Sequence, residues 1–149
     1  MTLQISQSQR YNYLADDDED DRQMFHEALL EVNSNAVLTQ AEDGKELLEI
    51  LSKNPKPLPE VIFLDINMPK IGGFECLEQI KQNKKLNKMP IIMLSTSSDP
   101  LTINRALQLG ANFYAVKPST FEDIKLLIKK VLQMDCLSIQ NDKQKFRLA

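Results

Sequence analysis

Short apolar runs alternate with longer amphipathic stretches along most of the chain. Five runs have the texture of β-strands, at residues 11–15, 36–40, 61–64, 90–94 and 111–116. Between and after them, apolar side chains recur every three or four residues, which predicts helices at 20–32, from Gly44, after Gly72-Gly73, at 101–109 and after the cap Thr120. Five strand–helix repeats predict an α/β fold, in which helices cover both faces of a doubly wound, five-stranded parallel sheet.

The length and the termini indicate a single domain with short extensions. The 149 residues fit one compact domain. We expect a flexible N-terminal extension at residues 1–10, a globular domain at 11–134, and a short polar tail at 135–149 that is frayed. Gly110 follows the fourth predicted helix and suits a left-handed cap.

Composition excludes several classes of protein. Eighteen basic and 21 acidic side chains give a net charge of -3, so nucleic acid is not expected as the main partner. No apolar run approaches the roughly 20 residues that cross a bilayer. Cys76 and Cys136 are far apart and His26 is the single histidine, which disfavours a disulfide framework or a zinc site. A reducing cytoplasm is therefore the expected location.

Polar residues follow four of the five predicted strands. Asp16-Asp17, Asp65, Ser95 and Lys117 come at or directly after strand ends. Ligands bind beyond the carboxyl ends of parallel strands, so these groups are expected to meet. Close carboxylates repel by about 4 kcal/mol per pair at an effective dielectric of about 20, and oxygen ligands without Cys or His favour Mg²⁺. Carboxylates beside Mg²⁺, a lysine and a hydroxyl can accept a phosphoryl group.

These residues stand within segments that resemble a known family, the CheY-like receiver domains of response regulators. The matching segments are Tyr13-Leu-Ala-Asp-Asp17, Leu64-Asp-Ile-Asn-Met-Pro-Lys-Ile-Gly-Gly73, Ile92-Met-Leu-Ser95 and Tyr114-Ala-Val-Lys-Pro118. The resemblance covers residues 11–134 and implies a flavodoxin-like (βα)5 fold with strand order 2-1-3-4-5.

The resemblance also implies a set of acidic residues that bind phosphoryl and metal. Asp65 is the implied phosphoacceptor. Asp17 and Asp65 are expected to bind Mg²⁺ directly, together with the backbone carbonyl of Asn67, and Asp16 mostly through water.

The resemblance also implies roles for residues within or directly after the last two predicted strands. Ser95 and Lys117 are expected to bind phosphoryl oxygens. Tyr114 matches an aromatic switch residue that turns inward with the hydroxyl residue. The Lys117–Pro118 bond is expected to be cis, which is uncommon for X-Pro bonds in general. Ser97 and Asn67 would flank the path of the hydrolytic water, and a small residue such as Ser97 positions that water weakly.

The function implied is that of a stand-alone response regulator in a two-component or phosphorelay system. A histidine kinase or histidine phosphotransfer protein would supply the phosphoryl group, and an unknown downstream protein would read the switched surface. With about 15 residues after the last helix, we expect no output domain, and either a monomer or a phosphorylation-dependent dimer. Apart from accepting and slowly losing its own phosphoryl group, the protein is not expected to be an enzyme.

The same residues allow other interpretations. A phosphohydrolase with an aspartyl nucleophile needs an acid two residues later, where this chain has Asn67. A structural adaptor that is never phosphorylated remains a second alternative. The acids at 18–21 are most simply a solvated helix start, because acids near a helix N-terminus are favoured. A calcium loop in this run lacks the glycine at position 6, where Asp21 stands. His26 is expected at the surface or at the boundary of the core rather than as a phosphodonor.

Overall fold

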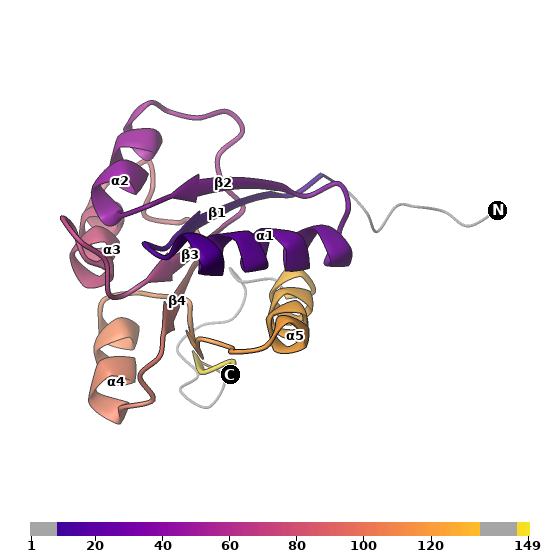
Figure 1. Ribbon diagram of the computed structural model, residues 1–149. Coiled ribbons are helices and arrows are strands. Elements are labelled where there is room, and N and C mark those ends of the chain that lie inside the picture. The colour runs from indigo at the N-terminus through magenta and orange to yellow at the C-terminus, as the bar shows by residue number, and fades with distance from the viewer. Residues whose placement is uncertain (1–8, 135–145) are drawn as a thin grey trace.

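A computed structural model describes residues 9–134 and 146–149. Its core is a parallel sheet in the order β2-β1-β3-β4-β5, which confirms the predicted topology (Figure 1). The strands are β1 Tyr11–Ala15, β2 Val37–Ala41, β3 Val61–Asp65, β4 Ile91–Ser95 and β5 Phe113–Val116. Each lies within two residues of its predicted start.

Helices cover both faces of the sheet, as predicted. They are α1 Glu19–Val32, α2 Gly44–Ser52, α3 Gly73–Gln82, α4 Pro100–Gln108 and α5 Phe121–Leu132. In Figure 1, α1 and α5 lie together on one side of the sheet, and α2, α3 and α4 line the other. Within the described part of the chain, no helix is both long and apolar enough to span a bilayer.

The central strand β3 and its neighbour β4 bury all of their side chains, as their apolar texture predicts. Every residue of β3 and β4 is buried. Side chains alternate between the faces, so Ile62 and Leu64 pack toward α2 and α3, while Phe63 packs toward α1 and α5. The ring of Phe63 meets that of Phe25 edge-on, with centroids 4.8 Å apart. This packing holds the carboxyl ends of the strands in register.

Helix caps follow the local sequence. Thr120 accepts a hydrogen bond from the backbone N–H of Asp123, as the prediction of a cap at Thr120 requires. Asp18, Asp43 and Asp99 cap α1, α2 and α4 in the same way. Gly110 has φ +100°, the left-handed conformation predicted for it.

The end of the chain departs from the expectation of a frayed tail. Residues 146–149 lie beside β5, where Leu148 N–H donates to Tyr114 O over 2.7 Å and Val116 N–H donates to Ala149 O over 3.0 Å. Phe146 is 4% exposed and packs in the core. The frayed-tail prediction is therefore wrong for these residues, because an aromatic anchor and backbone pairing hold them. Residues 135–145 and 1–8 of the two predicted extensions lie outside the described part, and Cys136 with them.

Candidate functional site

The parallel register brings the predicted chemical residues to one edge of the sheet. Asp65 is the last residue of β3 and pairs with Leu94, while Ser95 ends β4 and pairs with Val116. Asp16 follows β1 and Lys117 follows β5. These four strands all point the same way, so the four side chains converge as predicted.

Three carboxylates form the centre of the site. Oxygen atoms of Asp16, Asp17 and Asp65 lie within 4.8 Å of one another, close enough to bind one metal ion. Asp16 and Asp65 are buried, with 2% and 5% of their surface exposed, while Asp17 faces solvent. The N–H of Asn67 lies 3.4 Å from Asp65 Oδ1, so its backbone borders the cluster. A set of hard oxygen atoms with one solvent-facing member suits Mg²⁺, which keeps several waters.

Lys117 neutralises part of this negative charge. Its Nζ lies 2.9 Å from Asp16 Oδ2 and 3.2 Å from Asp65 Oδ2. A third contact, 3.0 Å to Asp21 Oδ2, was not expected from the sequence. Asp21 lies in the first turn of α1 with 45% of its side chain exposed, as the prediction of a solvated helix start requires, but it also faces Lys117, which that prediction does not include.

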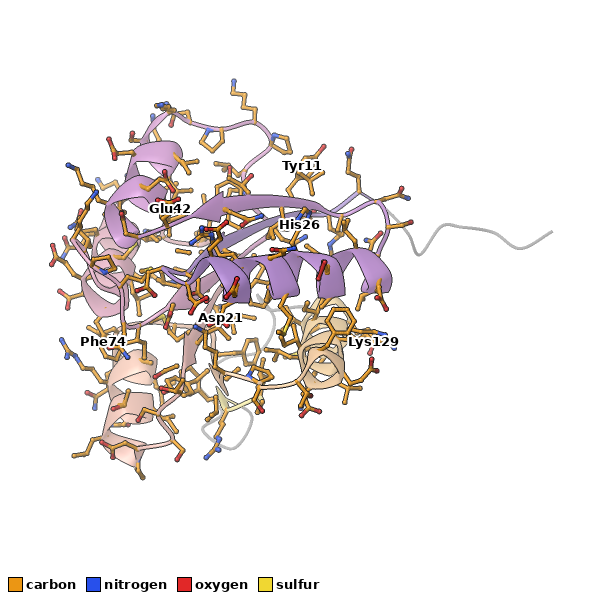
Figure 2. The ribbon with its side chains drawn as sticks, viewed as in Figure 1. Tyr11, Asp21, His26, Glu42, Phe74 and Lys129 are labelled. Carbon is orange, nitrogen blue, oxygen red and sulfur yellow. The ribbon has the colours of Figure 1, made fainter. Side chains whose placement is uncertain are left out.

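The remaining residues of the acidic run and His26 lie away from this centre. Asp18 caps α1, which starts at Glu19, so the later acids lie in a helix and not in a calcium loop. In Figure 2, Asp21 and His26 lie on different sides of α1. His26 therefore does not face the carboxylates, and it is half-buried, in agreement with its expected place at the surface or the boundary of the core.

Burial and charge shift the protonation of Asp65 in opposite directions. Burial raises the pKa of Asp65, the Lys117 ammonium lowers it, and the Asp16 carboxylate raises it again, leaving the pKa at about 6. Burial also lowers the pKa of Lys117, but hydrogen bonds to Asp16 and Asp21 and the charges of Asp65 and Asp16 raise it more, so the net shift is upward. Lys117 is thus a permanent cation beside a carboxylate that ionises near neutral pH.

Ser95 and Tyr114 are joined through the loop after β4. The side chain of Ser95 accepts a hydrogen bond from Ser97 N–H over 3.0 Å, and Ser95 is 1% exposed. The hydroxyl of Tyr114 donates to the Ser97 carbonyl over 2.7 Å. The Tyr114 ring is fully buried, so the predicted switch residue already points inward.

Backbone contacts hold the acidic residues in place. Asp18 N–H donates to Asp16 Oδ1 over 3.0 Å, and Arg22 donates to the Asp16 carbonyl over 2.7 Å. After β3, Gly73 packs so closely that an added Cβ would lie 2.3 Å from the carbonyl oxygen of Asp65. Local geometry as well as sheet register therefore positions Asp16 and Asp65.

One backbone expectation is wrong. The cis peptide bond within the described residues joins Lys56 to Pro57, and the Lys117–Pro118 bond is trans. The trans form is favoured for X-Pro bonds by about 0.5–1 kcal/mol. Lys117 reaches all three carboxylates with this bond trans, so the salt bridges do not require the cis form.

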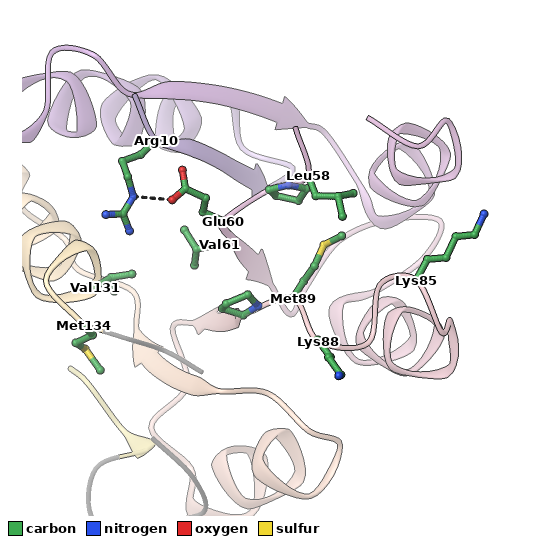
Figure 3. A pocket seen from close by; sticks show the side chains of 11 residues that line it. Arg10, Leu58, Glu60, Val61, Lys85, Lys88, Met89, Val131 and Met134 are labelled. Atoms are coloured by element: carbon green, nitrogen blue, oxygen red, sulfur yellow. Dashed lines mark ion pairs between the residues drawn. The ribbon is translucent and has the colours of Figure 1, made fainter. Parts of the chain in front are cut away.

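Two of the cavities in the described part of the chain lie at opposite ends of the strands. One of about 320 Å³ adjoins the site between α1, β4 and the start of α5, and its lining includes Asp16, Asp21, Phe25, Lys117 and Leu127. The other, of about 410 Å³, lies at the amino ends of β3 and β4 (Figure 3). Among its described lining residues the carboxylate is Glu60, which pairs with Arg10 over 3.0 Å. Among the described residues, the cluster of acids therefore lies only at the carboxyl ends of the strands.

Comparison with known proteins agrees with this geometry. Residues 13–129 match the family model of the response regulator receiver domain. The chain belongs to this family. It is 34% identical over 119 residues to a chemotaxis protein CheY homolog of Campylobacter jejuni, a match that covers 80% of this chain and 89% of that protein.

Further matches of this receiver domain include another curated protein and two solved structures. A probable methanogenesis regulatory protein, FilR2 of Methanothrix harundinacea, is 35% identical over 92 residues, which are 60% of this chain and 59% of that protein. The match therefore spans less than two thirds of that relative. The phosphorylated cyanobacterial phytochrome response regulator RcpA superposes with a TM-score of 0.76 at 26% identity, covering 83% of this chain and 91% of the other. CheY4 of Vibrio cholerae gives 0.70 at 28% identity, covering 83% and 99%.

The family match establishes the general role of the chain. It is a CheY-like receiver domain of a two-component response regulator.

Proposed function

We propose that Asp65 accepts a phosphoryl group from a phosphohistidine of a histidine kinase or histidine phosphotransfer protein. An Asp65 carboxylate oxygen forms the new O–P bond while the P–N bond to the imidazole breaks, and the imidazole leaves with the bonding electrons. The observation that carries this proposal is the meeting of the Asp16, Asp17 and Asp65 oxygens within 4.8 Å, with the Lys117 ammonium 3.2 Å from Asp65.

Asp17 and Asp65, with the Asn67 carbonyl, would hold Mg²⁺, and Asp16 would act through water. When bound, the ion would offset negative charge on the transferring phosphoryl oxygens. Asp65 is buried, and its ion pair with Lys117 holds its side chain in place. Lys117 contacts three carboxylates but carries a single positive charge, so a second cation is expected to balance the remaining negative charge.

Ser95 and Lys117 are proposed to bind the phosphoryl oxygens after transfer. Ser95 lies at the end of β4 beside β3, and its buried hydroxyl has a proton to donate. Lys117 is anchored by three carboxylates and keeps its charge. Fixed donors that face the developing charge are the principal source of catalysis in phosphoryl transfer.

The surface beside the site suits a protein donor. In the cavity of about 320 Å³, the partly exposed apolar residues Met24 and Pro118 line the wall together with Lys117. A helix that carries the phosphohistidine would place its apolar neighbours there. Asp65 would then be approached from the side of Asp17, which is exposed.

We further propose that the protein is a switch rather than a conventional enzyme. Phosphorylation would alter a surface that a downstream protein binds, and the domain would act in the cytoplasm as a monomer or a phosphorylation-dependent dimer. Asn67, two residues after Asp65, offers no acid for a phosphohydrolase mechanism. The complete set of acids, serine and lysine disfavours an adaptor that is never phosphorylated.

Intact mass measurement after treatment with acetyl phosphate and Mg²⁺ tests the proposal. We expect one added phosphoryl group on the wild type and none on Asp65→Asn. Asp20→Asn is the matched control, since it removes one acid from the exposed part of the run, and it should accept phosphoryl as the wild type does. Absence of an adduct on the wild type would favour the adaptor, and steady turnover of a generic phosphate ester would favour the phosphohydrolase.

A further inference from the structure

The outer edge of β5 is occupied by residues 146–149 of the same chain. Leu148 N–H donates to Tyr114 O, and Ala149 O accepts from Val116 N–H, so the segment extends the sheet as a parallel strand would. Lys130 of α5 donates to the Leu148 carbonyl over 3.3 Å. An exposed strand edge is a ready site for an added strand, and here the added strand comes from the chain itself.

The anchor of this segment contacts the residue that is linked to the phosphoryl site. Phe146 is 4% exposed, and its ring centroid lies 6.5 Å from that of the fully buried Tyr114. The Tyr114 hydroxyl donates to the Ser97 carbonyl, and Ser97 N–H donates to Ser95 Oγ. A continuous series of contacts therefore runs from Phe146 through Tyr114 and Ser97 to Ser95.

We propose that residues 146–149 are an intramolecular ligand of the β5 edge and that their docking is coupled to phosphorylation of Asp65 through Tyr114 and Ser97. The inference rests on the proposed phosphorylation of Asp65. Beyond that function, it identifies residues 146–149 as the segment that binds the β5 edge and names the residues that connect this segment to Asp65.

The direction of the coupling follows from the hydrogen bonds. A phosphoryl group on Asp65 draws the Ser95 hydroxyl toward the phosphoryl oxygens. The backbone N–H of Ser97 donates a hydrogen bond to Ser95 Oγ, so Ser97 is held in place together with Ser95. The Ser97 carbonyl then holds the Tyr114 hydroxyl and keeps the ring inward, where Phe146 packs against it. Phosphorylation thus tightens docking. Because coupling between two sites is reciprocal, docking also favours the phosphorylated form.

The consequence for partners is competition. A protein that adds a strand to β5 must displace residues 146–149, and the phosphorylated domain resists this displacement more strongly. A partner that contacts the docked segment together with α5 is favoured instead. Phosphorylation therefore favours partners that bind the docked segment over partners that add a strand to β5.

Hydrogen exchange of the Leu148 amide, combined with intact mass, tests the coupling in the whole chain. With acetyl phosphate and Mg²⁺ in excess, we expect Leu148 exchange in the wild type to slow by roughly fivefold or more, the lower end of typical coupling. In Tyr114→Phe the ring still packs on Phe146 but the bond to Ser97 is lost. That variant should dock the segment, accept phosphoryl and lose the change in exchange.

The reciprocal measurement uses variants of the segment. Phe146→Ala and Leu148→Pro should each lower the phosphorylated fraction at limiting acetyl phosphate by roughly fivefold. Leu148→Pro removes the N–H that donates to Tyr114 and a partly buried leucine side chain but keeps Phe146, so it serves if the alanine variant folds poorly. Phe121→Ala is the control for Phe146→Ala, since Phe121 packs against the other face of the sheet from Phe146. The phosphorylated fraction of Phe121→Ala should match that of the wild type.

The outcomes separate this inference from the proposed function. An adduct on the wild type with unchanged or faster Leu148 exchange overturns the coupling and leaves the phosphoacceptor role intact. Equal phosphorylated fractions in wild type, Phe146→Ala and Leu148→Pro overturn it as well. If the wild type forms no adduct, the phosphoacceptor role fails and the coupling fails with it.

Discussion

The ammonium of Lys117 lies 3.2 Å from a carboxylate oxygen of Asp65, although 52 residues separate the two in the sequence. Lys117 also contacts Asp16 and Asp21, so a single cation balances three acids. Removing it leaves buried carboxylates that repel one another, and takes away a group that would offset charge on a transferring phosphoryl group.

Replacing Lys117 by alanine is therefore expected to slow phosphorylation by acetyl phosphate about 100-fold, the lower end of the cost of removing one such donor. The rate of adduct formation by intact mass measures this effect. Lys129→Ala is the matched control, because Lys129 is an exposed lysine of α5 (Figure 2). Equal rates for the Lys117 variant and the wild type would remove Lys117 from the mechanism.

The raised pKa of Asp65 predicts how stability depends on pH without Mg²⁺. Burial raises this pKa to about 6, against 3.8 in the unfolded chain, so the folded state binds the proton more tightly. The contribution of Asp65 to stability is then present at low pH and is lost as the pH rises from about 4 through about 6. Asp65→Asn stays neutral and should be more stable than the wild type at pH 7.5, by about 1–3 kcal/mol.

Urea unfolding in EDTA at pH 4.5 and 7.5 gives the two free energies to be compared. The difference between variant and wild type should shrink at pH 4.5, where the wild-type carboxyl is mostly protonated. Mg²⁺ at pH 7.5 should stabilise the wild type more than Asp65→Asn, because it binds the native acids. A variant that is less stable than the wild type at both pH values would contradict the assigned cause.

Gly73 is predicted to tolerate no side chain. An added Cβ would lie 2.3 Å from Asp65 O and 2.7 Å from Ile66 Cα, both backbone atoms that cannot move aside easily. Gly73→Ala should destabilise the fold by about 1–3 kcal/mol and displace Asp65. Thermal unfolding and adduct formation together report both effects.

The neighbouring glycine provides the matched control. At Gly72 the nearest atom to an added Cβ is Ile66 O at 3.4 Å, and the backbone has φ -76°, which any residue adopts. Gly72→Ala should therefore unfold near the wild-type temperature and keep its phosphorylation rate. If both alanine variants lose stability equally, the close packing at Gly73 is not the cause.

The lifetime of the phosphoryl group is predicted to respond to residue 97. The Ser97 hydroxyl accepts the Asp99 N–H over 3.1 Å, so it serves the turn before α4 and is a weak positioner of water. Ser97→Glu adds a carboxylate that can accept a proton from the hydrolytic water, and should shorten the lifetime by up to about 100-fold. Loss of the adduct in Mg²⁺ after removal of acetyl phosphate measures it. An unchanged lifetime would mean that residue 97 does not border the water.

The fold and the centre of the site are predictable from local patterns in the sequence. The apolar runs of β3 and β4 bury every side chain, and period-2 alternation distributes them between the two faces. Once the strands are parallel, the positions of Asp65 and Lys117 at strand ends bring them to one edge. The meeting of these groups was therefore predictable without any tertiary information.

Three features were not predictable in this way, each for its own reason. Whether Asp21 faces Lys117 depends on the rotation of α1 against the sheet, which an unbroken acidic run does not reveal. The isomer of the Lys117–Pro118 bond depends on loop geometry, and the resemblance gave the wrong one. The docking of residues 146–149 rests on one aromatic side chain and a few backbone bonds, too short a segment for any periodicity.

The division of the molecule into two ends has a practical use. The clustered acids, Ser95 and Lys117 follow the strands, while Leu58 lies before β3 at the far end, 46% exposed and lining the cavity of Figure 3. A cysteine introduced there gives an attachment point for a dye or a solid support. Immobilised in this way, the domain presents its reactive edge to the solution, so that donor proteins are free to approach it.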